Sequence, residues 1–511
     1  MKPIWHAVIL GAALCVSSFI PGATRAEDWP MWGRTPDRRM NSPEKDPPTS
    51  WDIEKGTNIR WSAQLGSQSY GNPVIAGGLV FVGTNNEAKR DPKFTDDAGV
   101  LMIFRESDGK FLYQRVSPKL KAGRVNDWPY QGVCSTVTAE GDYIWYCTNR
   151  CEVVCLDVSP LRKGEAAPKE VWVNDMMATL GVFPHNMTSC SPGIYKDYIY
   201  IITGNGVSED HKNVPSPKAP AIVCMDKKTG KVVWSDNAPL EGVLHGQWSS
   251  PTIVELNGHT QVVCAEGDSW VRSYDALTGK LLWKFDCNYK GAPYPAIRNE
   301  LIATPVVVDG LMYIATGQDP EHGEGVGIFW CVDVSKGHDG NDLSLQIDTP
   351  DAEKPKPGQE LVSTSAEVNA HTGKPNPDSA VVWHYVRNAG PADKIKRKDR
   401  MNRSISTAAV AEGICIIPDY SGFIHVFDAK TGAPLWTYDM EAAMWGSPLI
   451  IDGKIYLCNE ESNVVIFKLS RTLEKIAENT LGSASYCSPV FANGTLYVTS
   501  REKLYAIQNA K

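Results

Sequence analysis

The sequence predicts an all-β protein, an eight-bladed β-propeller made of four-stranded antiparallel blades. Three observations lead to this fold class. A short motif recurs along the chain, each copy contains three or four short apolar runs separated by Gly and Asp turns, and the last copy lacks a strand that the N-terminal region supplies. A regular array of such four-stranded units is typical of β-propellers.

The clearest copies of the repeat open with Ser-Pro and end with Asp, Thr-Gly-Lys and Trp, and looser copies keep the same order. The clearest copy runs from Ser250-Pro251 through Asp275 and Thr278-Gly279-Lys280 to Trp283. We expect the eight copies to open at Asn72, Ser135, Ser191, Ser250, Thr304, Ser406, Ser447 and Ser488. Each opening is followed by a β-branched or apolar run, as expected for the first strand of a blade.

The ends of the chain predict how the ring closes. The last copy has apolar runs at 489–491, 496–499 and 504–507, and no Trp strand follows them. Asn58-Ile59-Arg60-Trp61 resembles the Trp strands of the other copies but has no preceding strands. We therefore expect this N-terminal strand to pair into the C-terminal blade, which closes the ring and removes an exposed sheet edge.

The first 26 residues are predicted to be a signal peptide. Lys2 precedes an apolar run over 7–20, and small residues come just before a cleavage site after Ala26. Leu14 precedes Cys15, which argues against a lipoprotein signal. No apolar stretch reaches the roughly 20 residues that a membrane span needs. The expected location is therefore periplasmic or secreted.

The mature chain divides into two parts. Residues 27–57 are expected to form an extended arm, and residues 58–511 the propeller. Residues 337–378, rich in Pro and charged side chains, interrupt the turn between the third and fourth strands of blade five, and we expect a flexible insertion there. The net charge of −8 argues against nucleic-acid binding, and we expect a monomer.

Candidate site residues lie where the segments leading into each first strand converge on the axis. Trp248, Trp445 and Tyr486 contribute aromatic rings to this funnel, and His245 and Arg403 contribute polar or cationic groups. Stacking and charge pairing of this kind suit a planar, polyanionic quinone. For His245, a hydrogen-bonded funnel-wall residue is the preferred interpretation over a catalytic base.

The repeat ending resembles the tryptophan-docking motif of quinoprotein alcohol dehydrogenase propellers. The mature chain as a whole resembles the PQQ-like repeat family, which also includes the BamB-like outer-membrane assembly proteins. The resemblance implies that the Trp of one blade docks on its neighbour. It implies no particular activity, because sites are grafted onto such scaffolds.

The resemblance also identifies one metal-ligand position. Asn205, in Thr203-Gly204-Asn205, matches the dehydrogenase Asn that binds calcium beside the quinone, although Gly-Asn is also a favoured turn pair. In the following motif Trp248 is kept, but Ser249 stands where the family has Asp. A hydroxyl cannot replace a carboxylate as base or calcium ligand. Calcium and PQQ thus remain possible cofactors of an altered site.

A second acidic segment, 318–324, contains three carboxylates and His322. Such oxygen-rich loops suit hard cations, but the segment lacks an EF-hand pattern, so a solvated loop is the preferred interpretation.

Three functions fit the sequence. The preferred hypothesis is a non-catalytic, exported scaffold that binds a protein or peptide partner at the propeller face, as a BamB-like protein would. The alternative is a divergent PQQ- and calcium-dependent oxidoreductase acting on alcohols or sugars. Carbohydrate binding by the aromatic rim is the third.

Overall fold

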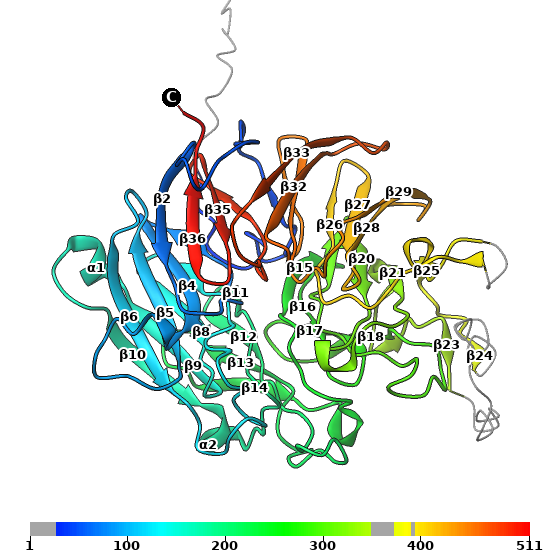
Figure 1. Cartoon of the computed structure of the whole chain (residues 1–511). Coiled ribbons are helices and arrows are strands. Elements are labelled where there is room, and N and C mark those ends of the chain that lie inside the picture. The colour runs from blue at the N-terminus through cyan, green and yellow to red at the C-terminus, as the bar shows by residue number, and fades with distance from the viewer. Residues whose placement is uncertain (1–26, 349–372, 390–393, 511) are drawn as a thin grey trace, which may run out of the picture.

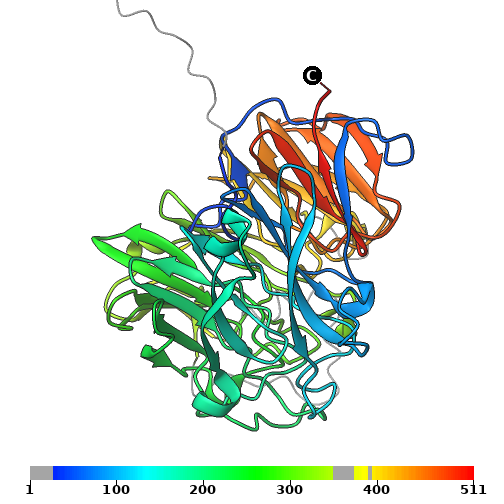
Figure 2. The same ribbon diagram turned by 90° about the vertical axis from the view of Figure 1, so that its left-hand side faces the viewer.

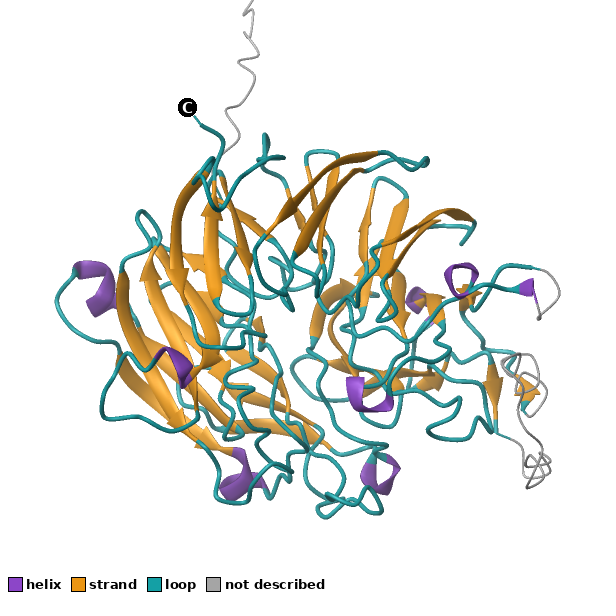
Figure 3. Ribbon diagram, in the orientation of Figure 1, coloured by secondary structure: helices purple, strands orange, loops and turns teal. Residues whose placement is uncertain are grey.

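The computed structural model describes residues 27–348, 373–389 and 394–510, and it is an eight-bladed β-propeller. Eight four-stranded antiparallel units surround a central axis (Figure 1), and the helices of the described residues are few and short (Figure 3). The predicted fold class is confirmed. The predicted signal peptide, with its cleavage after Ala26, lies outside the described residues.

The strands follow the chain blade by blade, with the last blade completed from the N-terminal side. Blades one to four comprise β3 (Val74–Ala76), β4 (Leu79–Asn85), β5 (Ala98–Arg105), β6 (Phe111–Pro118), β7 (Thr138–Glu140), β8 (Tyr143–Cys147), β9 (Glu152–Asp157), β10 (Lys169–Asp175), β11 (Gly193–Tyr195), β12 (Tyr198–Ile202), β13 (Ile222–Asp226), β14 (Val232–Asp236), β15 (Thr252–Leu256), β16 (His259–Ala265), β17 (Trp270–Asp275) and β18 (Leu281–Asp286). Blades five to eight comprise β19 (Val306–Val308), β20 (Leu311–Ala315), β21 (Phe329–Asp333), β25 (Val381–Tyr385), β26 (Ala409–Ala411), β27 (Ile414–Pro418), β28 (Phe423–Asp428), β29 (Pro434–Asp439), β30 (Leu449–Ile451), β31 (Lys454–Cys458), β32 (Asn463–Lys468), β33 (Lys475–Thr480), β34 (Val490–Ala492), β35 (Thr495–Thr499), β36 (Lys503–Ile507) and β2 (Ile59–Gln64).

Short elements decorate the blades. They are β1 (Asn41–Ser42), β22 (Asn341–Asp342), β23 (Gln346–Ile347), β24 (Lys374–Pro375), α1 (Ser159–Lys163), α2 (Met176–Leu180) and the 3₁₀ turns η1 (Asn86–Ala88), η2 (Leu240–Gly242), η3 (Pro320–His322), η4 (Val334–Lys336) and η6 (Arg397–Asp399). Within the described residues, no helix has the length and apolar character needed to cross a membrane.

The ring closes as predicted. β2 pairs antiparallel with β36, and the register runs from Ile59 opposite Ile507 to Gln64 opposite Lys503. Both views show the blue N-terminal strand beside the red C-terminal strands (Figures 1 and 2). The last blade is therefore held by both ends of the described propeller.

The segment before β2 packs against several blades. Trp29 and Trp51 are buried, and β1 adds a parallel strand to β30 of blade seven. The fully buried guanidinium of Arg38 donates hydrogen bonds to the carbonyl oxygens of Pro251 (3.0 Å) and Pro192 (3.1 Å), in the segments that open blades four and three. The arm thus ties neighbouring blades together.

The blade-five insertion begins and ends against the propeller. β21 pairs with β25 across it, and β22 adds a parallel strand to β18 of blade four. Leu343 is fully buried. Residues 349–372, the centre of the insertion predicted to be flexible, lie outside the described residues.

At four of the blade interfaces, the outer part explains the Gly and Trp positions of the repeat. The Trp234 indole of blade three donates to the Ala276 carbonyl of blade four at 3.0 Å. Its ring lies over Gly279, where an added Cβ would come within 2.7 Å of the indole. Gly279 also has φ +70°, so glycine is required both for the turn and for the neighbour's indole. Trp61, Trp172 and Trp383 dock in the same way on Gly109, Gly230 and Gly432.

The inner part of the interface is a closed ring of eight hydrogen bonds. The backbone N–H of each blade's opening residue donates to the side-chain oxygen of the next blade's opening residue, as Ser191 does to Ser250 (2.9 Å). The ring runs through Asn72, Thr136, Ser191, Ser250, Thr304, Thr407, Ser447 and Ser488, and returns to Asn72. The openings predicted at Ser135 and Ser406 are wrong by one residue, because Thr136 and Thr407 supply the acceptor oxygens. The Ser-Pro motif is therefore an inter-blade joint.

Candidate functional site

A cavity of about 390 Å³ lies on the axis, inside the ring of hydrogen bonds. Every blade contributes to its wall the residue two positions before its opening residue. These eight are Tyr70, Cys134, Ser189, Trp248, Ile302, Ile405, Trp445 and Tyr486. The predicted funnel residues Trp248, Trp445 and Tyr486 therefore lie together at one site.

One side of the cavity is an aromatic wall formed by blades seven, eight and one. Tyr70 and Tyr486 stack with ring centroids 4.9 Å apart, and Trp445 meets Tyr486 edge-on at 5.1 Å. The Trp445 indole N–H donates to a carboxylate oxygen of Glu460, which fixes the orientation of the ring. Offset and edge-on pairs of this kind form stable platforms for an apolar ligand.

The opposite side, from blades three to five, is a polar cluster around His245, which is fully buried. The Trp248 indole donates to the His185 carbonyl at 3.1 Å and packs edge-on against the His245 ring at 5.1 Å. Nε2 of His245 lies 2.8 Å from Nε2 of His185. His245 is thus hydrogen-bonded to a neighbouring loop residue, but it lies behind Trp248 and is not part of the cavity lining.

The other ring nitrogen of His245 faces two carboxylates. Its Nδ1 contacts Asp319 and lies 3.5 Å from Oε1 of Glu300. Burial disfavours the charged imidazole, but hydrogen bonds to Asp319 and Glu300 outweigh burial and raise the pKa of His245 to about 10. Burial and the neighbouring His245 lower the pKa of His185 to about 4. The two histidines thus differ in protonation although their rings touch.

Asp319 and His322 of the acidic segment 318–324 belong to this cluster, whereas Glu321 and Glu324 are exposed. Asp319 is 6% exposed and caps η3, accepting from the backbone N–H (3.2 Å) and from Nδ1 (3.1 Å) of His322. Burial opposes the Asp319 charge, but His245 and His322 lower the pKa of Asp319 well below its ordinary value. The solvated-loop interpretation is wrong for Asp319, because the turn folds inward over His245.

Arg403 serves this turn rather than the cavity. Its buried guanidinium donates to the carbonyl oxygens of His322 (2.8 Å) and Pro295 (2.8 Å) and to Oδ1 of Asn299 (3.0 Å). These bonds use the guanidinium N–H groups that were expected to bind an anionic ligand in the funnel. Arg403 is placed to hold the His322 turn in position.

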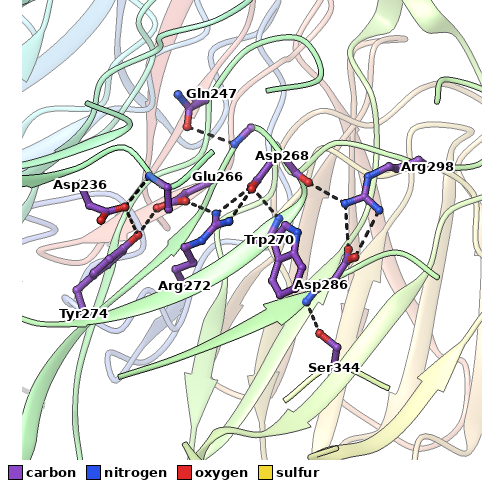
Figure 4. Close-up of polar contacts among 12 residues, drawn as sticks. Asp236, Gln247, Glu266, Asp268, Trp270, Arg272, Tyr274, Asp286, Arg298 and Ser344 are labelled. Atoms are coloured by element: carbon purple, nitrogen blue, oxygen red, sulfur yellow. Dashed lines mark hydrogen bonds and ion pairs between the residues drawn. The ribbon is translucent and has the colours of Figure 1, made fainter. Parts of the chain in front are cut away.

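A buried ionic network supports the same sector of the ring (Figure 4). Arg272 pairs with Asp268 at 2.6 Å and with Glu266, and Tyr274 links Glu266 to Asp236 of blade three through 2.9 Å bonds. Burial raises the pKa of Glu266 to about 7 against the opposing effect of Arg272. On the other side Arg298 joins this network to Asp286, so blades three and four and the segment leading into blade five are linked behind the cluster.

The residues present do not fit PQQ with calcium. The Asn205 amide oxygen accepts the backbone N–H of Phe183 (2.9 Å), its nitrogen donates to Ser216, and the residue is 3% exposed. Ser249 donates its hydroxyl to the Ala303 carbonyl. Among the described residues that line the cavity there is neither lysine nor arginine, so a polyanionic quinone would lack charge partners.

Sequence reasoning missed Glu300 and the inward position of Asp319 and His322. Glu300 follows Asn299 in an irregular segment with no repeat motif. Its isolated bridge to Gly317 brings it beside His245, a non-local contact that no local pattern encodes.

Comparisons with known proteins agree with the fold. The chain matches the family described as "Outer membrane protein assembly factor BamB" over residues 164–329 and 296–511. The outer membrane protein assembly factor BamB of Yersinia pestis is 20% identical over 362 residues, which cover 69% of this chain and 81% of that protein. BamB from Moraxella catarrhalis superposes with a TM-score of 0.54 at 14% identity, covering 88% of this chain and 98% of that one.

A europium-containing methanol dehydrogenase superposes with a TM-score of 0.60 at 11% identity, covering 95% of this chain and 98% of that one. At such identities the structural matches show the shared propeller fold alone. Together with the repeats, the family match shows that this chain belongs to the PQQ-like β-propeller family of the outer membrane protein assembly factor BamB.

Proposed function

We propose that this protein is an exported, non-catalytic propeller of the cell envelope that binds a protein partner through its axial cavity. Its BamB relatives are named for outer-membrane protein assembly, and the predicted signal peptide agrees with export. The observation that carries the proposal is the aromatic wall of Tyr70, Trp445 and Tyr486, because clustered aromatics are typical of protein-binding hot spots.

The lining of the cavity suggests which kind of segment it binds. Asp319 and Glu321 border it, and its described lining carries no lysine or arginine. An apolar or aromatic side chain would pack on Tyr486 and Trp445, and a neighbouring Lys or Arg of the partner would complement the acidic side. A peptide that combines the two is the expected ligand.

The oxidoreductase alternative is less well supported. Asn205 is engaged by backbone groups, Ser249 replaces the expected carboxylate, and the described cavity lining lacks cationic partners for a quinone.

Binding selection on the purified full chain tests the proposal. A library of peptides from envelope proteins is selected on the wild type and on Trp445→Ala, and the Kd of recovered peptides is measured by calorimetry. The expected result is a family of basic, aromatic peptides whose affinity falls at least about tenfold in Trp445→Ala. Saturable binding of PQQ with calcium, and dye-linked oxidation of an alcohol, would instead establish the alternative.

A further inference from the structure

Four side chains of the polar cluster converge as metal ligands do. His245, Glu300, Asp319 and His322 each offer one nitrogen or oxygen atom, and these atoms all lie within 4.8 Å of one another. Three of the four residues are buried, and Asp319 reaches the wall of the axial cavity. Closing to tetrahedral coordination, with ligand atoms about 3.3 Å apart, takes a shift of about 1 Å.

The hydrogen bonds of His185 decide which atom of His245 is available. Nδ1 of His185 lies 2.7 Å from the Val207 carbonyl oxygen, which only accepts, so this nitrogen carries the proton. Nε2 of His185 therefore accepts, and Nε2 of His245 must donate to it across 2.8 Å. In a neutral His245 the lone pair is then on Nδ1, facing the carboxylates of Asp319 and Glu300.

A lone pair directed at two carboxylates requires a cation between them. A proton on Nδ1 of His245 would give Asp319 a hydrogen-bond donor, but it would leave Oε2 of Glu300 without a partner. Glu300 is 1% exposed, and its Oε2 has no hydrogen-bond partner among the described residues, while Oε1 accepts from Tyr294 at 2.8 Å. An unpaired buried carboxylate oxygen is destabilising unless a cation neutralises it.

We propose that His245, His322, Glu300 and Asp319 bind a divalent transition metal of the zinc class, and that His185 is the residue that positions His245. Two imidazoles and two carboxylates suit such an ion, and the carboxylates balance its charge. Metal-bound histidines usually donate their other ring N–H to an acceptor. For His245 that acceptor is His185, which is held in turn by the Val207 carbonyl. The proposal does not rest on partner binding at the aromatic wall, and Asp319 is the one proposed ligand that also lines the axial cavity.

A neighbouring triad is the alternative location. His211 lies with its ring centroid 4.5 Å from that of His245, and it forms a second group with His185 and His245. That group would need the Nε2 atoms of both His185 and His245 as ligands, yet these atoms share a proton with each other. His211 is also exposed. The geometry therefore favours the carboxylate side.

The two histidines beside His245 give a matched test. The full chain is freed of metal with a chelator and titrated with Zn²⁺ by calorimetry and with Co²⁺ by visible absorption. We expect one equivalent of either ion to bind, with tetrahedral Co²⁺ bands, and Zn²⁺ to raise the Tm. His322→Gln and Glu300→Gln should weaken binding at least about tenfold, whereas His211→Gln should leave it within about twofold.

Circular dichroism and the metal-free Tm check that each variant is folded, and half-buried His322 is the safer change if Glu300→Gln fails to fold. The exposed His259, which pairs with Asp275 far from the cavity, provides a further control as His259→Gln. Absence of saturable Zn²⁺ and Co²⁺ binding by the wild type would overturn the proposal. So would full affinity in His322→Gln together with loss in His211→Gln.

Discussion

The outer and inner parts of the blade interfaces obey opposite rules. At the rim the same pair recurs, with Trp172, Trp234 and Trp383 each lying on a neighbour's turn glycine. At the axis, the position two residues before each joint varies among the blades and is Tyr, Cys, Ser, Trp or Ile. Repetition therefore marks what holds the ring together, and divergence marks what the ring binds.

The largest effect expected is loss of a rim indole. Trp383→Ala removes the bond to the Ala429 carbonyl and the packing against Phe329 and Phe427, so the free energy of unfolding should fall by about 3–5 kcal/mol. Trp445→Ala, at the axis, should cost only about 1 kcal/mol. Denaturant unfolding measures both losses of stability. Peptide binding should be retained by Trp383→Ala and weakened in Trp445→Ala. Equal losses of stability would show that the rim indoles stabilise the ring no more than the axial aromatic residues do.

A rim glycine should come next. Gly279→Ala places a methyl group 2.7 Å from the Trp234 indole at φ +70°. Gly258→Ala is the matched control, because Gly258 has φ +76° and nothing within 4 Å of the added Cβ. Backbone strain should lower the free energy of unfolding of the control by about 1–2 kcal/mol. Overpacking should lower that of Gly279→Ala by a further ~1–3 kcal/mol. Indistinguishable urea midpoints would show that docking contributes nothing.

Loss of one hydrogen bond of the inner ring should have a smaller effect. Ser250→Ala leaves the buried N–H of Ser191 without an acceptor, so we expect a loss of about 1–3 kcal/mol. Ser249→Ala, one residue earlier, removes only a donor to the Ala303 carbonyl and should cost less, because unpaired carbonyls are better tolerated. The reverse order of the two unfolding midpoints would contradict this account of the joint.

The smallest effect concerns the repeat aspartate and pH. The backbone N–H of Thr431 and the Arg471 guanidinium lower the pKa of Asp428 to about 2. Its stabilising contribution is complete above its ordinary pKa of about 4 and is lost as the pH falls through 2. The stability difference between wild type and Asp428→Asn, followed by fluorescence in urea from pH 5 to 2, should shrink below pH 4. A constant difference would exclude this role.

The sequence was sufficient for the fold because the repeat is local. The pattern of Thr278-Gly279-Lys280 and Trp283 recurs with regular spacing, and Trp61 marks the N-terminal segment as the closing strand. The site was only partly predictable. Trp248, Trp445 and Tyr486 were found because their place in the repeat puts them on the axis. Glu300 was missed because its approach to His245 depends on irregular loops, where no periodicity exists.

Arg403 shows the same limit from the other side. Its charge suggested an anion-binding site, but its guanidinium donates hydrogen bonds to the carbonyl oxygens of His322 and Pro295. The sequence gives the charge of Arg403, but the partners of a buried guanidinium depend on the three-dimensional arrangement of the loops around it.

The ring of hydrogen bonds also bears on how such a protein can evolve. The joint uses a backbone N–H and a short side-chain oxygen, and it is chemically alike at Ser191, Ser250 and Ser447. The neighbouring axial residue takes no part in it. Mutations at the axial residue can therefore drift toward a new ligand while the joint stays intact, and a blade duplicated or exchanged between relatives would arrive with a compatible connector.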